Sequence, residues 1–159
     1  MPSADFQRSA DCLDPVRRWK QVVECHQLLD ALNGKPGREG KPNRLLSHPC
    51  LKMWVGYTQA LRLYTNHMLC TVLREKTHKV TAYRPFDFAG IGVKASAVPM
   101  PPWLGWEKFH RSQRSNLLRK DEQFYRRFGW TEPTDLPYEW PSPTGEYDTA
   151  PVLDSLFDY

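Results

Sequence analysis

The stretch LDPVRRWKQVVECHQLL, from Leu13 to Leu29, reads as one amphipathic helix. At helical spacing its polar side carries Arg17, Lys20 or Gln21, Glu24, and Gln27 or Leu28. We expect a different arc to face the core, made of Val16, Trp19, Val23 and His26. The polar side then holds one carboxylate, Glu24, among basic and amide groups. It is either a solvated surface or part of a site, and the rest of the chain must decide between them.

The residues around this stretch indicate where the helix begins and ends. Asp11 or Asp14 can cap its start, and Pro15 suits the first helical position. The pair Asn33-Gly34 predicts its end. Residues 34–44, GKPGREGKPNR, then form a flexible basic loop, which either reaches a phosphate backbone or only connects two helices.

A second helix is expected to open at Ser47, with Pro49 near its first position, and to run to about Thr77. Its apolar stripe consists of Leu51, Trp54, Val55, Leu61, Tyr64, Met68 and Val72. A helix of this length, about 28 residues, would form the centre of the core.

The chain after this helix changes character twice. Residues 78–102 form a long irregular connection, whose Tyr83, Phe86 and Phe88 either stack on bases or pack the loop onto the core. Residues 103–130 predict a further helix, restarted at Asp121 or Glu122 and stopped by Gly129. The proline-rich tail should lie as an extended strap.

Together these patterns predict a mainly α fold. We expect a compact single-domain bundle around a long central helix, with long irregular loops and an extended C-terminal strap. Residues 1–130 would form a basic helical body. Residues 131–159 would form the acidic, proline-rich strap of the same domain.

Charge is divided unevenly along the chain. All 22 Lys and Arg lie at or before Arg127, so residues 1–130, with 11 acids, carry +11, while residues 131–159 carry seven acids and no base. A strongly basic body is typical of a protein with a polyanionic partner, although it can also serve solubility alone. The acidic tail is a solvated strap, a docking site for a basic partner, or a cover for the body's own basic surface.

Several classes of protein are excluded by what the sequence lacks. It has no apolar run of the ~18 residues that a membrane span needs and no secretory h-region. Its cysteines (Cys12, Cys25, Cys50 and Cys70) are too far apart for a zinc site and read as reduced thiols. We expect a monomer without metal, cofactor or membrane contact, in a bacterial or phage-infected cytoplasm or, in a eukaryote, the nucleus.

No common catalytic motif is present, so catalysis would have to use few groups. Aminopeptidases generally remove Met1 before a small residue, which would leave a secondary amine at Pro2. Such an amine can attack C1′ of a nucleotide, displace the base and form an imine, with Glu24 stabilising the sugar or moving a proton. The nucleotide must first be exposed by bending the duplex or flipping the base.

Four segments also carry a family resemblance. They are the opening stretch Leu13 to Leu29, HPCLKMWVGYTQAL (48–61), WLGWEKFHRSQRSNLLRKDEQFY (103–125) and DLPYEWP (135–141). With them the chain resembles the phage pyrimidine-dimer DNA glycosylases of the endonuclease V type, and more closely a group of their uncharacterised bacterial and phage relatives. The resemblance implies a compact helical fold without cofactor, a nucleophilic amine exposed by Met removal, and an essential glutamate on the first helix.

In this chain Pro2 and Glu24 match that catalytic pair, and they lie 22 residues apart, close to the family's separation. The candidate DNA-binding residues are Arg17, Lys20, Gln21, His48, His110, Arg111, Gln113, Arg114, Ser115, Arg119 and Lys120. The chain departs from the family at Val23, where the family has arginine, and from its close relatives at Gln113, where they have histidine. Its N-terminus is also shorter than theirs.

Two main hypotheses follow. The first is a DNA-repair glycosylase with abasic-site (AP) lyase activity on damaged or modified pyrimidines of double-stranded DNA. The second is a DNA-binding module of the same fold, without catalysis, that recognises distorted or modified DNA.

Overall fold

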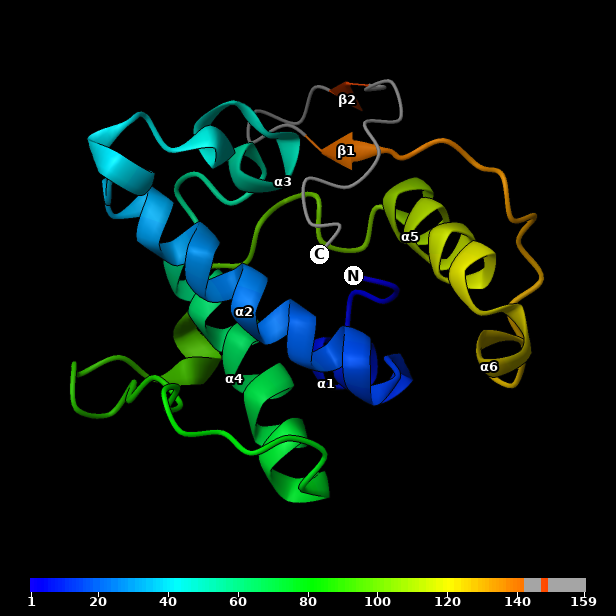
Figure 1. The fold of residues 1–159 in the computed structure, drawn as a ribbon, viewed down its shortest axis with the longest axis horizontal. Helices are drawn as coiled ribbons and strands as arrows, with labels where there is room; N and C mark the ends of the chain where they lie inside the picture. The colour runs from blue at the N-terminus through cyan, green and yellow to red at the C-terminus, as the bar shows by residue number, and fades with distance from the viewer. Residues whose placement is uncertain (142–146, 149–159) are drawn as a thin grey trace.

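The computed structural model of the chain describes residues 1–141 and 147–148. Helices dominate this part, as the sequence predicts (Figure 1). The α-helices are α1 (Phe6–Cys12), α2 (Pro15–Leu32), α3 (Pro49–Lys52), α4 (Thr58–Glu75), α5 (Glu107–Lys120) and α6 (Glu122–Arg126). Single 3₁₀ turns occupy Arg38–Gly40, Arg44–Ser47 and Ala95–Ala97. The short strands β1 (Trp140–Pro141) and β2 (Tyr147–Asp148) pair antiparallel, with Trp140 opposite Asp148.

Helix α2 begins and ends where the sequence predicts. The Asp14 carboxylate accepts hydrogen bonds from the backbone N–H groups of Val16 and Arg17, and Pro15 takes the first helical position. Asn33 caps the other end, followed by Gly34 in a left-handed conformation (φ 79°).

The predicted core face of α2 is wrong. The buried side chains are Arg18, Val22, Cys25, Leu28, Leu29 and Ala31, whereas Val16 is 69% exposed. Both arcs have helical spacing, and each is covered by a different partner. Helix α4 covers the buried arc, while the loop after α4 only half-covers Trp19 and His26 through His78, Tyr83 and Phe86.

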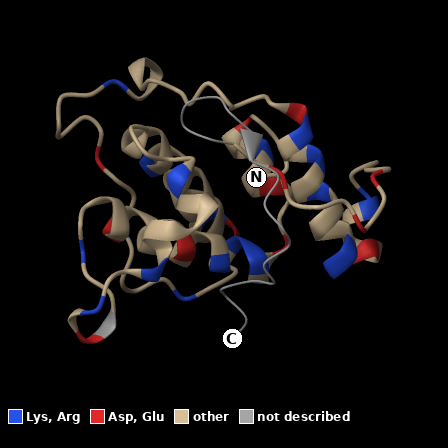
Figure 2. Cartoon of the chain, turned by 90° about the horizontal axis from the view of Figure 1, so that it is seen from above, with Lys and Arg blue, Asp and Glu red and all other residues tan. Residues whose placement is uncertain are grey.

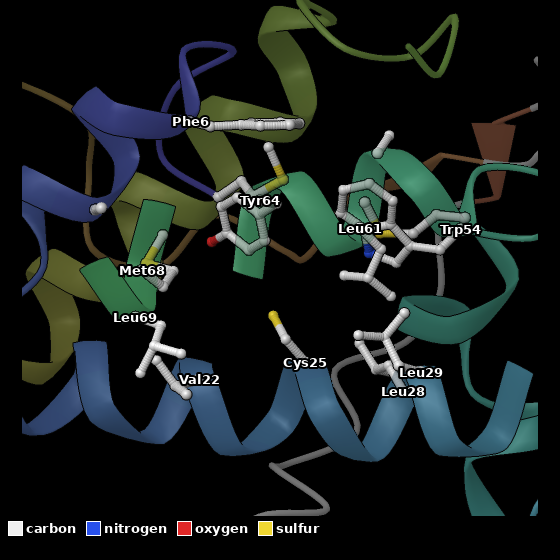
Figure 3. Packing of buried hydrophobic residues seen from close by; sticks show 14 of the residues in the cluster. Phe6, Val22, Cys25, Leu28, Leu29, Trp54, Leu61, Tyr64, Met68 and Leu69 are labelled. Atoms are coloured by element: carbon white, nitrogen blue, oxygen red, sulfur yellow. The ribbon is translucent and has the colours of Figure 1, made fainter. Parts of the chain in front are cut away.

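The core lies mainly between α2 and α4. Figure 3 shows Val22, Cys25 and Leu28 of α2 pointing toward α4. Opposite them, Leu61, Met68 and Leu69 are 0% exposed. This burial of apolar area is the main force that holds the two helices together.

Helix α1 was not expected from the sequence. Asp5 caps it by accepting from the backbone N–H of Arg8, and Phe6 packs edge-on against Tyr64 of α4 at 5.2 Å. The buried Arg18 fixes the α1–α2 junction by donating to the carbonyl oxygens of Ala10 (2.7 Å) and Leu13 (2.6 Å). It also pairs with Glu75 at the end of α4.

The expected continuous helix from Ser47 to Thr77 is also wrong. The chain forms a 3₁₀ turn, the short α3 capped by His48, and then α4. Between them Gly56 adopts φ 82°, which no regular right-handed helix contains. Leu51 and Trp54 are buried as expected, but the break leaves Val55 48% exposed.

Helix α6 begins where the sequence predicts a new helix. Asp121 caps α6, and Gly129 follows it with φ 74°.

The strap packs on α5. The hydroxyl oxygens of Ser112 and Ser115 accept hydrogen bonds from the backbone N–H groups of Glu139 (3.1 Å) and Leu136 (3.0 Å). Residues 131–141 therefore run as the expected extended strap, while 142–146 and 149–159 lie outside the described residues.

The mainly α, compact fold is confirmed. Among the described residues, no helix is both long and apolar enough to span a bilayer. The four cysteines all lie in the described part and are free thiols.

Candidate active site

The start of the chain lies in a partly open cavity of about 210 Å³ between α2, α4, α5 and the strap. Met1 and Pro2 both line it. So does the polar side of α2, through Arg17, Lys20, Gln21, Glu24 and Leu28. Figure 1 shows the N-terminus between α1 and α5. The polar side of the opening helix is thus part of a cavity rather than a solvated surface.

Helix α5 holds the chain start in place. His110 contacts the Met1 carbonyl oxygen through Nδ1 (3.0 Å), and its Nε2 accepts from the Gly105 backbone N–H (3.2 Å). This pairing fits a neutral imidazole that donates from Nδ1, and burial lowers the pKa of His110 accordingly. Arg114 donates to the Pro2 carbonyl oxygen at 3.0 Å.

Glu24 is held by a short chain of polar groups. Gln21 donates from Nε2 to the Glu24 carboxylate (3.0 Å), and the Tyr64 hydroxyl donates to the amide oxygen of Gln21 (3.4 Å). Burial raises the pKa of Glu24, against the opposing charges of Lys20 and Lys120. A carboxyl group of this kind can take up or release a proton nearer neutral pH than a solvated glutamate.

Burial has the opposite effect on the amine at the chain start. It lowers the pKa of the Met1 amine to about 5, because an ammonium loses its hydration in the cavity wall. The nearby Glu24 carboxylate only partly offsets this effect. The Met1 amine is therefore neutral at pH 7.

Burial shifts the pKa of two cysteine thiols in the cavity upward, whereas it shifts the pKa of the Met1 amine downward. Cys25 and Cys50 both line the cavity. Burial raises the pKa of each thiol to about 12. Both thiols stay protonated at neutral pH and are poor nucleophiles. The described residues contain no group of three His, Cys, Asp or Glu side chains placed to hold a metal ion.

Eight of the eleven predicted DNA-binding residues fall into two groups. One group lines the cavity: Arg17, Lys20, Gln21, His48, Gln113 and Lys120. In the other, Arg111 and Arg119 are exposed on α5. Figure 2 shows basic residues spread along this part of the molecule, beside the N-terminus.

Three of the predicted residues are not placed to touch a phosphate. His110 and Ser115 are 1% and 0% exposed, because one holds the chain start and the other the strap. Arg114 is engaged by Glu107 and Glu132 as well as by Pro2. Their positions suit a structural role, which a sequence pattern alone does not separate from a phosphate contact.

The aromatic residues of the 78–102 loop do not line the cavity. Tyr83 and Phe86 pack against His26 of α2, at ring-centroid distances of 4.1 and 5.5 Å. Phe88 is 8% exposed within the core. The packing interpretation of this loop is therefore correct for all three.

Sequence reasoning missed several cavity residues. Tyr64, which supports Gln21, was assigned only to the apolar stripe. Phe109, Asn116, Tyr138 and Trp140 also line the cavity. Two of them, Tyr138 and Trp140, lie in the motif DLPYEWP, which was the available signal that the strap contributes to a site.

The comparison with known families agrees with this geometry. Residues 1–82, just over half of the 159-residue chain, match the family "Pyrimidine dimer DNA glycosylase". The chain belongs to this family, which is one of DNA-repair enzymes. No curated protein and no solved structure matches the chain.

Proposed function

We propose that the protein is a DNA-repair glycosylase with AP lyase activity on damaged or modified pyrimidines of double-stranded DNA. The observation that carries the proposal is that the chain start and Glu24, which lie 22 residues apart in the sequence, line one cavity. The family supports DNA as the substrate. The exposed basic residues of α5 support binding to a phosphate backbone.

The mechanism needs only residues of this chain. After Met1 is removed, the Pro2 nitrogen attacks C1′, the C1′–N bond to the base breaks, and the base leaves with the bonding electrons and takes up a proton. The Pro2 nitrogen gives up its proton, and the C1′–O4′ bond breaks with its electrons and a proton going to O4′, which gives an iminium ion. A base then removes a proton from C2′, and the C3′–O bond breaks, so that the strand on the 3′ side leaves with a 5′-phosphate. Water finally hydrolyses the iminium and releases Pro2.

Glu24 is the group that would serve these steps. It lines the same cavity, and Gln21 fixes its direction. As a carboxylate it stabilises the positive charge on the sugar, and it is the acceptor for the C2′ proton. Its raised pKa makes it a stronger base than a solvated carboxylate.

One observation favours the alternative, a DNA-binding module without catalysis. While Met1 is present, the Pro2 nitrogen is part of a peptide bond, and Met1 itself is only 9% exposed. The alternative predicts salt-dependent binding to damaged DNA that survives Glu24→Gln, with no covalent intermediate.

Borohydride trapping on duplexes carrying a thymine dimer, a modified thymine or an abasic site distinguishes the two. We expect a covalent adduct, and mass spectrometry of its peptides should place the sugar on the Pro2 nitrogen. An N-terminal extension, which turns this nitrogen into an amide, should abolish trapping. The absence of any adduct, or trapping undiminished by the extension, would exclude the imine mechanism.

A further inference from the structure

The cavity has a second wall, built by residues beyond the segment that matches the family. Residues 1–82 supply the chain start and Glu24. The second part of the lining comes from Phe109, Gln113 and Asn116 of α5 and from Tyr138 and Trp140 of the strap. This wall shares the cavity with the groups assigned to the chemistry and contains none of them, so it can bind another part of the substrate.

Gln113 carries the one buried side-chain atom of this wall that lacks a hydrogen-bond partner among the described residues. Its Nε2 is buried and has no hydrogen bond among the described residues. The other buried side-chain atoms in this condition belong to Arg62, Thr77, His78, Glu132 and Glu139, none of which lines the cavity. A buried N–H without an acceptor is unfavourable, so the position suits a ligand that brings an acceptor with it.

Trp140 gives the same wall a planar apolar surface. It is half-buried and is fixed by its neighbours: Tyr138 stacks with it at 5.6 Å, and His48 meets it edge-on at 5.7 Å. The backbone of the strap next to it is tied to Ser112 of α5. A ring held in this way can pack against a flat ligand with little loss of side-chain freedom.

We propose that this wall is the base-specificity site: it holds the single pyrimidine attached to the attacked sugar, with Gln113 donating to a ring carbonyl oxygen and Trp140 packing on the ring. The cavity has a volume of about 210 Å³ with Met1 in its lining, and removal of Met1 would enlarge the space beside this wall. The linked partner base of a dimer would stay at the mouth. This inference rests on the proposed function and deepens it.

The test compares two duplexes of equal sequence, one with a thymine dimer and one with a tetrahydrofuran abasic analogue that has no base. We expect Gln113→Leu to weaken binding to the dimer duplex at least tenfold and binding to the abasic duplex less than twofold. Gln123→Leu, a matched change at an exposed position of α6, should alter neither affinity. Trp140→Ala should show the same selectivity as Gln113→Leu, and Trp140→Phe should restore most of the lost affinity.

Each outcome decides the inference. Equal losses on both duplexes would mark Gln113 and Trp140 as scaffold residues, and unchanged affinities would remove them from recognition; both results overturn the base-specificity site. Thermal unfolding identifies a variant that fails to fold, in which case the remaining variant decides. Trapping of the wild-type protein on abasic DNA tests the proposed function separately, because that substrate has no base to recognise.

Discussion

Glu24 sits where a carboxylate is costly, half-buried in the wall of a cavity and held by one amide donor. If it moves the C2′ proton, Glu24→Gln should lower strand cleavage by a factor of about 10²–10⁴, the usual contribution of a general base. Binding to abasic DNA should change by less than about threefold, since the amide keeps the shape and can still meet Gln21. Gel assays of cleavage and fluorescence anisotropy measure the two quantities.

The control for this substitution is Glu39→Gln, at an exposed loop position where the carboxylate pairs with Lys41. It should leave both cleavage and binding unchanged. Cleavage by Glu24→Gln at the wild-type rate would remove Glu24 from the mechanism.

A second prediction at this scale concerns the pH dependence of imine formation. Burial lowers the pKa of the Met1 amine from 8.0 to about 5. Once Met1 is removed, we expect burial in the same cavity to lower the pKa of the Pro2 amine as well. The Pro2 amine should then stay neutral below the pH at which a solvated amine becomes protonated, and the rate of borohydride trapping should fall only at more acidic pH.

The variant Glu24→Gln shows whether the amine or the Glu24 carboxyl group causes the fall in trapping rate at low pH. If the amine is responsible, the fall should persist when the carboxyl group is removed. A decline that instead begins near pH 8, as for a solvated amine, would contradict the buried position of the nucleophile.

Some of these residues were readable from the sequence, and others were not. That Pro2 and Glu24 line one cavity was predictable from their spacing and the family resemblance. The roles of Gln21 and Tyr64 were not, because a contact between α2 and α4 leaves no local pattern. Basic residues are equally ambiguous: Arg114 looks like a phosphate contact but holds the chain start and the strap.

At the scale of elements, Asp14 joins α2 to α6. It caps α2, and its carboxylate accepts a hydrogen bond from the Tyr125 hydroxyl at 2.6 Å. Asp14→Ala should lower the free energy of unfolding by about 2 kcal/mol, roughly half from the lost cap and half from the stranded buried hydroxyl. Urea denaturation measures the change.

Asp5→Ala provides the comparison, since Asp5 caps α1 at an exposed position without a buried partner. This substitution should lower the free energy of unfolding by about 1 kcal/mol. Equal losses for the two substitutions would mean that the contact with Tyr125 contributes nothing to stability.

Gly56 determines where α3 ends and α4 can begin. Its φ of 82° is left-handed, and an added Cβ would meet nothing within 4 Å. Gly56→Ala should therefore destabilise the fold by about 1–2 kcal/mol through the backbone alone. Gly56→Asn should cost less, because asparagine tolerates this conformation better; the reverse order in urea denaturation would contradict the argument.

The same glycine explains the largest error in the predicted elements. Apolar residues recur at helical spacing on both sides of Gly56, so periodicity alone predicts one helix. Periodicity could not choose the core face of α2 either, because α4 covers one arc and the loop after it half-covers the other. The caps, Asp14 and Asn33, were predictable because capping is a local interaction.

At the scale of the whole molecule, the acidic tail lowers the formal charge of the protein. Removing residues 142–159 takes away four acids and no base, so the formal charge rises from +4 to +8. If the tail covers the basic surface, the truncated protein should bind duplex DNA several-fold more tightly at about 50 mM salt. The difference should shrink at about 0.5 M, where charges are screened.

Charge and length are separated by a full-length variant in which Glu146, Asp148, Asp154 and Asp158 become amides. It should reproduce the gain in affinity if charge is the cause. Unchanged affinity at low salt would count against a masking role. The described acids Glu132 and Glu139 are left in place in both proteins, because they already pair with Arg114 and Lys108.

The cavity joins Met1 and Pro2 to Tyr138 and Trp140, near opposite ends of the described chain. During synthesis, Met1 and Pro2 therefore leave the ribosome long before Tyr138 and Trp140 have been added to the chain. A nascent or prematurely terminated chain would carry the basic helices without the finished cavity. Any incision of DNA by this protein should therefore occur only after translation is complete. Incomplete chains would then not cut the genome.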